Sequence, residues 1–181
     1  MTRDEAEGIL AEADLIICAE DVQVAVKHVA RAISAALSRD FPLVLAVMGG
    51  ATIFAGHLLP MLGFPLEYDY LHATRYGDAT TGGELAWVVE PRASVTGRTV
   101  LLVDDILDEG ITLAAIRDRL ISQGAARVCT AVFADKQIGC DKPITPDFVG
   151  VQLPNRYVFG FGMDVSGAWR NLPAIYAVKG L

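Results

Sequence analysis

Short apolar runs that alternate with helical patterns organise this chain. Residues 43–48 and 100–103 are continuous apolar runs, which predict strands buried on both faces of a sheet. Between residues 20 and 39 apolar positions recur at helical spacing, which predicts an amphipathic helix ending before Pro42. Further helices are predicted at 4–13, at 51–62, and from a cap at Thr112 to Gly124. Further strands are predicted at 66–70, 84–90, 127–134, 148–153, 157–163 and 174–178.

This order of elements predicts an α/β fold with an open, mainly parallel twisted sheet flanked by helices. The length suits one domain over residues 1–181. The C-terminal part is less helical, and we expect a small hood lobe built from the N-terminal segment and roughly residues 136–175.

Composition narrows the class of protein. The chain is 52% hydrophobic, but no apolar run approaches the roughly 18 residues of a membrane span. The N-terminus lacks a basic segment followed by an apolar one, so we expect a soluble, cytoplasmic protein. A net charge of −7 without a Lys/Arg block argues against nucleic-acid and membrane partners. The three scattered histidines and three cysteines without a C-x-x-C pair indicate reduced thiols and no zinc site.

The stretch 104–112 carries the strongest candidate chemistry. Asp104, Asp105 and Asp108 follow the apolar run at 100–103, and a glycine and a threonine then lead into a helical pattern. Turn amides and a helix N-terminus can bind an anion there, while the acids face hydroxyls, a metal or a proton. A surface turn with solubilising acids is the alternative, but three acids followed directly by these residues favour a binding site.

Residues 100–112 resemble the phosphoribosyl-diphosphate signature of type I phosphoribosyltransferases. The segment 146–173 is similar to the C-terminal end of hypoxanthine-guanine phosphoribosyltransferases, and with 48–50 and Lys136 the resemblance covers roughly residues 40–178. It implies the type I fold and transfer of 5-phosphoribosyl from 5-phosphoribosyl 1-diphosphate to hypoxanthine or guanine in purine salvage. The products would be IMP or GMP and pyrophosphate, with Mg²⁺ as cofactor and a homodimer or homotetramer as the assembly.

The resemblance also implies roles in the central stretch. Asp104 and Asp105 would hold the ribose hydroxyls and favour positive charge developing on the sugar. Asp108 would share a proton with purine N7. The 5′-phosphate would be wrapped by the backbone of Glu109, Gly110, Ile111 and Thr112. Glu109 stands where the family has Thr or Ser, so we expect its carboxylate to point outward and only its N–H to serve the phosphate.

Two loops are implied at the pyrophosphate. Met48 and Gly49 match a family loop in which the peptide bond can be cis, although a tight turn that needs glycine explains Gly49-Gly50 nearly as well. Met48 carries no charge, so only backbone N–H groups of this loop would bind the pyrophosphate. The loop 75–83 would be a lid, with Arg75 supplying the missing positive charge and Tyr76 matching the family's tyrosine. An ordinary hairpin loop is the alternative.

The remaining implied residues lie toward the C-terminus. Lys136 would donate to the purine 6-oxo group, Tyr157 would stack on the base, and Val158 would offer main-chain groups. Asp164, with Asp104 and Asp105, would bind magnesium, and Arg170 would reach pyrophosphate. Without the resemblance, Lys136 would be interpreted as a solvated lysine, and Tyr157 and Val158 as strand residues of a small core. Asp164 would be an acid in a turn, and Arg170 a surface charge.

A second hypothesis is a regulatory protein of the same fold that binds the donor or a nucleotide without catalysis. Retention of Asp108 and Lys136 and the acidic balance favour the enzyme. A dinucleotide-binding oxidoreductase and a P-loop kinase are disfavoured, because G-x-G-x-x-G and G-x-x-x-x-G-K-[ST] are both absent.

Overall fold

A computed structural model describes residues 1–75 and 85–181 of the chain. The predicted lid and Tyr76 lie outside the described residues, as does the side chain of Arg75. Within the described ranges, no helix combines the length and apolar character needed to cross a membrane.

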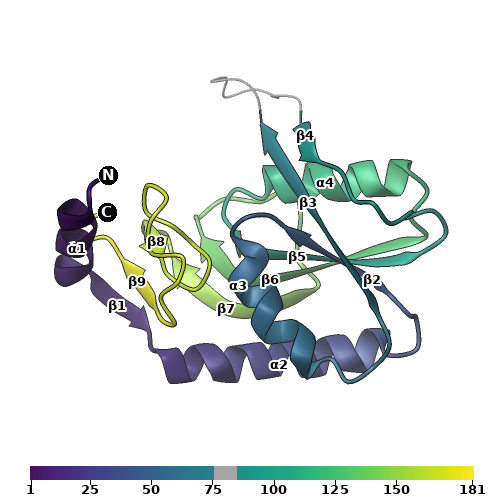
Figure 1. Ribbon diagram of the computed structural model, residues 1–181, viewed down its shortest axis with the longest axis horizontal. Coiled ribbons are helices and arrows are strands. Elements are labelled where there is room, and N and C mark those ends of the chain that lie inside the picture. Colours follow the sequence, from purple (N-terminus) through teal and green to yellow (C-terminus); the bar gives the residue numbers. More distant parts are fainter. Residues whose placement is uncertain (76–84) are drawn as a thin grey trace.

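A six-stranded sheet forms the centre of the molecule, in the order β4-β3-β2-β5-β6-β7 (Figure 1). All neighbours are parallel except β4, which is antiparallel to β3. The predicted open, mainly parallel sheet is therefore confirmed. Its strands are β2 (Leu43–Val47), β3 (Glu67–Arg75), β4 (Leu85–Val89), β5 (Thr99–Leu107), β6 (Arg127–Gln137) and β7 (Phe148–Pro154).

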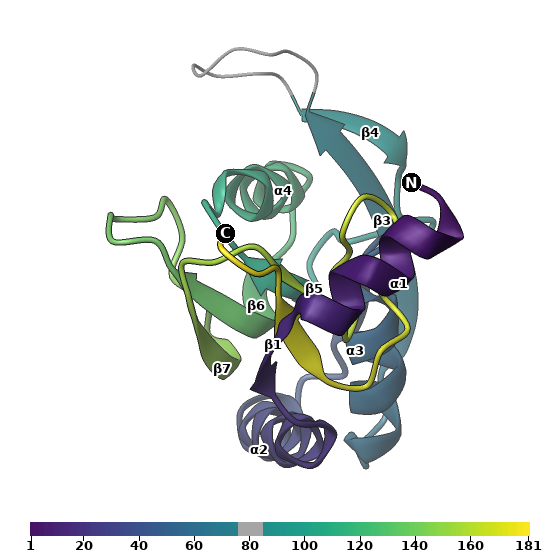
Figure 2. The ribbon, with the colours of Figure 1, turned by 90° about the vertical axis from the view of Figure 1, so that its left-hand side faces the viewer.

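Helices cover both faces of this sheet (Figure 2). On one face, α2 (Ala19–Leu37) and α3 (Ala51–Leu58) pack against alternate residues of β2 and β5, and a 3₁₀ turn at Leu59–Met61 follows α3. On the other face, α4 (Ile111–Ser122) packs against the intervening residues of the same strands. The two central strands are buried on both sides, which explains why their sequences are continuous apolar runs.

A second, three-stranded sheet joins the two ends of the chain. In it β9 (Ile175–Ala177) lies between β1 (Asp14–Ile17) and β8 (Val158–Phe159), and α1 (Arg3–Glu12) precedes β1. Of the range 136–175 expected in the hood, β7 pairs with β6 in the large sheet, whereas β8 belongs to the small one. Figure 1 shows the small sheet beside the carboxyl ends of β5 and β6.

Local structure corrects three expectations from the sequence. The central strand continues to Leu107, so the first two acids of the stretch lie within β5 rather than in the turn after it. The predicted strand at 157–163 shrinks to two residues, because Gly160 and Gly162 adopt φ of 98° and 104°. The expected cap at Thr112 is wrong: α4 begins at Ile111, and Gly110, at φ 78°, precedes it without a side-chain cap.

Candidate active site

The turn from β5 into α4 surrounds a cavity of about 390 Å³. The first amides of α4 have no carbonyl partner within the helix and supply donors for an anion. Glu109 is exposed at the rim, and Asp108 is about half exposed. The cavity is lined by Asp104, Ile106, Leu107, Asp108, Glu109, Gly110, Ile111, Thr112 and Leu113. The structure thus brings together, around one cavity, every predicted ribose and phosphate residue except Asp105.

The two acids within β5 are held by their neighbours' backbone amides. The Asp105 amide donates to Oδ1 of Asp104 at 2.9 Å, and the Ile106 amide donates to Oδ1 of Asp105 at 2.9 Å. Burial raises the pKa of Asp104 well above its ordinary value, and the negative charge of Asp105 raises it further. Burial also raises the pKa of Asp105, although the nearby Arg170 and backbone hydrogen bonds oppose that rise. Ionisation of this pair is costly until a ligand donates hydrogen bonds or positive charge.

The loop after β2 lies directly against Asp105. The Met48–Gly49 peptide bond is cis, and a methyl group added at Gly50 would overlap the Asp105 carboxylate. On the other side, a methyl group at Gly162 would overlap the carbonyl of Gly50. Two glycines therefore allow the loop at 48–50, the end of β5 and the turn after β8 to meet without side chains between them.

Arg170 connects these three segments. Its guanidinium donates to the Gly162 carbonyl at 2.6 Å and lies 2.5 Å from Oδ1 of Asp164. The same group lies 4.0 Å from Oδ2 of Asp105. Asp164 also accepts from the Gly167 amide at 2.7 Å. The structure thus places the arginine predicted at pyrophosphate between two of the acids predicted at magnesium.

The oxygens of these acids suit a magnesium ion. Among residues 1–75 and 85–181, no three His, Cys, Asp or Glu side chains are grouped closely enough to hold a metal by themselves. Mg²⁺ typically binds one or two carboxylates together with substrate phosphates, so a complete protein cage is not needed. Asp105 and Asp164 both lie close to the Arg170 guanidinium and fit this partial set.

On the other side of the turn, Nζ of Lys136 lies 2.9 Å from Oδ2 of Asp108. Lys136 lies within β6 rather than just after a strand, and its side chain is only 13% exposed. Tyr157 is exposed and directly precedes β8, and Val158 is buried within β8. The structure therefore pairs two predicted base-side residues and places Val158, but not Tyr157, in the small sheet.

Lys142 was not predicted as a site residue. It lies in the loop that follows β6, and its ammonium group bonds the ends of β5 and β6, although Leu107 lies 35 positions earlier in the chain. A lysine between an aspartate and a proline in an irregular loop has the pattern of a surface charge, so neither spacing nor periodicity indicates its position.

The chain is similar to known proteins over most of its length. Residues 19–166 match the model of the phosphoribosyl transferase domain. A hypoxanthine-guanine phosphoribosyltransferase of Bacillus subtilis is 31% identical over 166 residues, which cover 91% of this chain and 92% of that protein. A hypoxanthine-guanine-xanthine phosphoribosyltransferase of Tritrichomonas foetus is 31% identical over 179 residues, which cover 97% and 93%.

Other relatives differ in length. The chain spans only 26% of the bifunctional protein TilS/HprT of Listeria innocua, to which it is 34% identical over 166 residues, or 91% of this chain. A crystal structure of a hypoxanthine-guanine phosphoribosyltransferase from Bacillus anthracis superimposes with a TM-score of 0.86 at 30% identity, covering 91% of this chain and 98% of that one. Because the domain model spans most of its residues, this chain belongs to the phosphoribosyl transferase domain family.

Proposed function

We propose that this protein transfers 5-phosphoribosyl from 5-phosphoribosyl 1-diphosphate to hypoxanthine or guanine, giving IMP or GMP and pyrophosphate. One observation carries the proposal: Asp104, near the end of β5, lines the same cavity as Asp108, which forms an ion pair with Lys136. This supports a site in which groups for the sugar and groups for the base lie close together. The names of the relatives from Bacillus subtilis and Aquifex aeolicus support a role in purine salvage.

The donor's 5′-phosphate is bound by the amides of residues 109–112 at the start of α4. Glu109, which is exposed, contributes its N–H while its carboxylate stays in solvent. Asp104 and Asp105 accept hydrogen bonds from the ribose hydroxyls, and these bonds favour the ionised carboxylates over the protonated ones. Their negative charge then stabilises the positive charge that develops on the sugar ring.

The purine binds at the Asp108–Lys136 pair. Lys136 donates to the 6-oxo group, which favours 6-oxopurines because the 6-amino group of adenine offers hydrogens instead. Asp108 accepts or shares the proton at N7 as the new bond forms at the base. Tyr157 stacks on the ring, and Val158 offers main-chain groups to its edge.

The pyrophosphate would be bound by the backbone of Met48 and Gly49, the guanidinium of Arg170, Arg75 at the end of β3, and Tyr76, which follows Arg75 in the chain. Asp164, with Asp104 and Asp105, would hold Mg²⁺. When bound, the ion neutralises negative charge on the pyrophosphate that leaves. Arg170 has a planar fork that can bind two phosphate oxygens at once. A homodimer or homotetramer and a cytoplasmic location remain predictions.

The regulatory alternative predicts donor or nucleotide binding without turnover. We would mix the protein with Mg²⁺ and the ribosyl diphosphate, add hypoxanthine, guanine, xanthine or adenine separately, and follow nucleotide formation. Product with hypoxanthine or guanine, and none with adenine, is the expected result. Donor binding without product from any 6-oxopurine would contradict the enzyme and support the regulator.

A further inference from the structure

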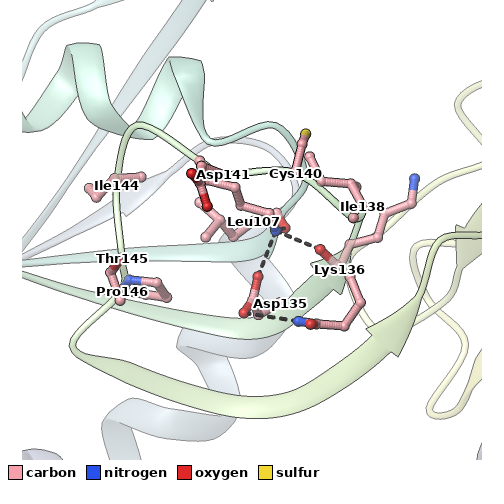
Figure 3. Close-up of a pocket in the computed structure, with 12 residues that line it drawn as sticks. Leu107, Asp135, Lys136, Ile138, Cys140, Asp141, Ile144, Thr145 and Pro146 are labelled. Atoms are coloured by element: carbon pink, nitrogen blue, oxygen red, sulfur yellow. Dashed lines mark hydrogen bonds and ion pairs between the residues drawn. The ribbon is translucent and has the colours of Figure 1, made fainter.

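Lys142 ties the ends of β5 and β6 together. Its Nζ donates to the Leu107 carbonyl at 2.8 Å, to the Lys136 carbonyl at 2.6 Å and to Oδ1 of Asp135 at 2.6 Å. The side chains of Lys142 and Asp135 are only 11% and 17% exposed. Figure 3 shows the cavity of about 490 Å³ at these strand ends, with the bonds to Asp135 and the Lys136 carbonyl dashed.

The position of this ammonium group follows from the strand pairing. Leu107 and Asp135 form the last register pair between β5 and β6, after which β5 turns toward α4 while β6 continues beside β7. Carbonyls at such a divergence need new hydrogen-bond donors. A lysine has three N–H donors, and all three are used here. Lys142 thus supplies donors to carbonyls of both strands where their hydrogen-bond ladder ends. The Lys136 carbonyl also accepts from the Ile138 amide at 3.0 Å.

The two bonded carbonyls adjoin the base-side residues. The Leu107 carbonyl belongs to the peptide bond that leads into Asp108, and the other carbonyl belongs to Lys136 itself. The side chains of Asp108 and Lys136 meet at 2.9 Å, so they are joined twice: directly, and through Lys142 behind them. We infer that Lys142 is a positioning residue. It sets the separation of Asp108 and Lys136 and hence the position in which the purine binds. This inference rests on the proposed function.

Lys142 contacts the strands on the proposed purine side of the site and not on the proposed pyrophosphate side. Gly50, Gly162 and Arg170, on the pyrophosphate side, lie close to Asp105. Lys142 instead bonds the last pair of β5 and β6, Leu107 and Asp135, and the carbonyl of Lys136 just beyond it. Loss of Lys142 should therefore loosen the base side while Arg170 and its partners keep their bonds. Purine binding and turnover are expected to respond more than donor binding.

We would compare Lys142→Met and Lys142→Arg with Lys179→Met, an exposed lysine near the C-terminus. Lys142→Met is expected to raise the purine KM or lower kcat about tenfold to hundredfold, since small displacements of reacting groups cost rates of that order. The donor KM should stay within about twofold to threefold of wild type. Lys142→Arg should recover part of the loss because it keeps a cation with several donors, and Lys179→Met should match wild type.

Lys142→Met leaves the half-buried carboxylate of Asp135 without a cation beside it, and the variant could fail to fold. The double variant Lys142→Met/Asp135→Asn removes that unpaired charge and is expected to show the same purine defect. Hydrogen exchange supplies a readout without turnover: amides of residues 136–146 should exchange faster in the variants, with α2 unchanged. An inactive wild-type protein would overturn the proposed function and this inference with it. An active wild type whose variants show unchanged purine kinetics, or an equal loss for both substrates, would overturn the inference alone.

Discussion

The ammonium group of Lys136 lies 2.9 Å from Oδ2 of Asp108, although 28 residues separate them in the chain. Lys136 is 13% exposed and Asp108 is 49% exposed. Half-exposed ion pairs contribute only about 0–1 kcal/mol to stability, so this contact does little to hold the fold together. In the proposed function its role is chemical, because it would hold a donor and an acceptor side by side for the 6-oxo group and N7 of the purine.

Asp108→Asn should impair turnover more than donor binding. The amide keeps the size of the side chain but cannot take a proton, so we expect kcat to fall about 10²- to 10⁴-fold. The donor KM should change by less than about threefold, because the substitution removes no contact proposed for the bound donor. Asp118→Asn, at an exposed acid on α4, is the control and should leave both unchanged. A larger loss in donor affinity than in kcat would contradict the role given to Asp108.

Asp104→Asn should stabilise the folded protein at neutral and higher pH. Burial and the Asp105 charge raise the pKa of Asp104 in the folded state, so the folded protein binds this proton more tightly than the unfolded chain does. Stability from this group is therefore present at low pH and is lost as pH rises through the raised pKa. We expect the variant's Tm to exceed that of wild type at about pH 8 and the difference to shrink toward about pH 4.

In this variant, the oxygen of the new side-chain amide can still accept the hydrogen bond from the Asp105 backbone N–H, so the substitution preserves the local geometry. Activity should nevertheless fall, because a neutral amide does not stabilise positive charge on the sugar. Thermal melts across the pH range test the predicted change in stability, and a nucleotide-formation assay tests the predicted loss of activity. A variant less stable than wild type at about pH 8 would count against the buried-charge explanation.

Gly50→Ala should weaken donor binding and stability together. The added methyl group would overlap the Asp105 carboxylate, which must then move. Overpacking of this kind costs about 1–3 kcal/mol, and displacement of Asp105 should raise the donor KM about tenfold or more. Chemical denaturation and steady-state kinetics would measure the two effects.

Gly56→Ala provides the matched control on the helix that follows. A methyl group there meets nothing within 4 Å, and the position lies inside α3. Alanine is the better helix former by about 0.5–1 kcal/mol, so this variant should be slightly more stable with unchanged kinetics. Equal losses from both glycines would show that the overlap with Asp105 is not the cause.

Arg170→Lys should raise the donor KM despite keeping the charge. A lysine cannot reproduce the planar fork that now reaches the Gly162 carbonyl and Asp164 at once. We expect about a tenfold increase for the donor and less than about threefold for the purine. The exposed Arg31 on α2 supplies a charge-matched control, Arg31→Lys. A purine KM that rises as much as the donor KM would refute the assignment to pyrophosphate.

Arg75→Ala should raise the apparent KM for the diphosphate donor, because Met48 brings no positive charge from the loop at residues 48–50. The exposed Arg92, just after β4, is the control, and Arg92→Ala should leave the donor KM unchanged. We expect an increase of about threefold to tenfold, the scale of one charge contact to phosphate. An unchanged donor KM would rule the hypothesis out.

The periodicity of the sequence predicted the large sheet well, because burial on both faces leaves a plain signature at β2 and β5. It predicted the end of β5 less well. Acidic residues are uncommon in strands, so the prediction stopped the strand before Asp104. The ladder to β6 continues through that residue because partner strands, and not local propensity, decide how far a strand extends.

The site was predicted in pieces by resemblance, but its connections were not. Threonine is a common helix cap, yet Gly110 takes that position because the turn needs a positive φ. Lys142 was missed because one partner, Leu107, lies 35 positions away and the other two lie at the far end of a loop without periodicity. Contacts through a single ammonium group depend on where strands diverge, and no pattern along the chain encodes that point.

The pairing of β1 with β9 has a consequence for the order in which the protein can assemble. Residues 14–17 are synthesised before residues 175–177, which are their only β-sheet partner among the described residues. The large sheet can form before those residues exist, whereas the small sheet that carries Val158 cannot. A nascent chain would thus complete the turn from β5 into α4 first and form the small sheet only after synthesis has passed β9.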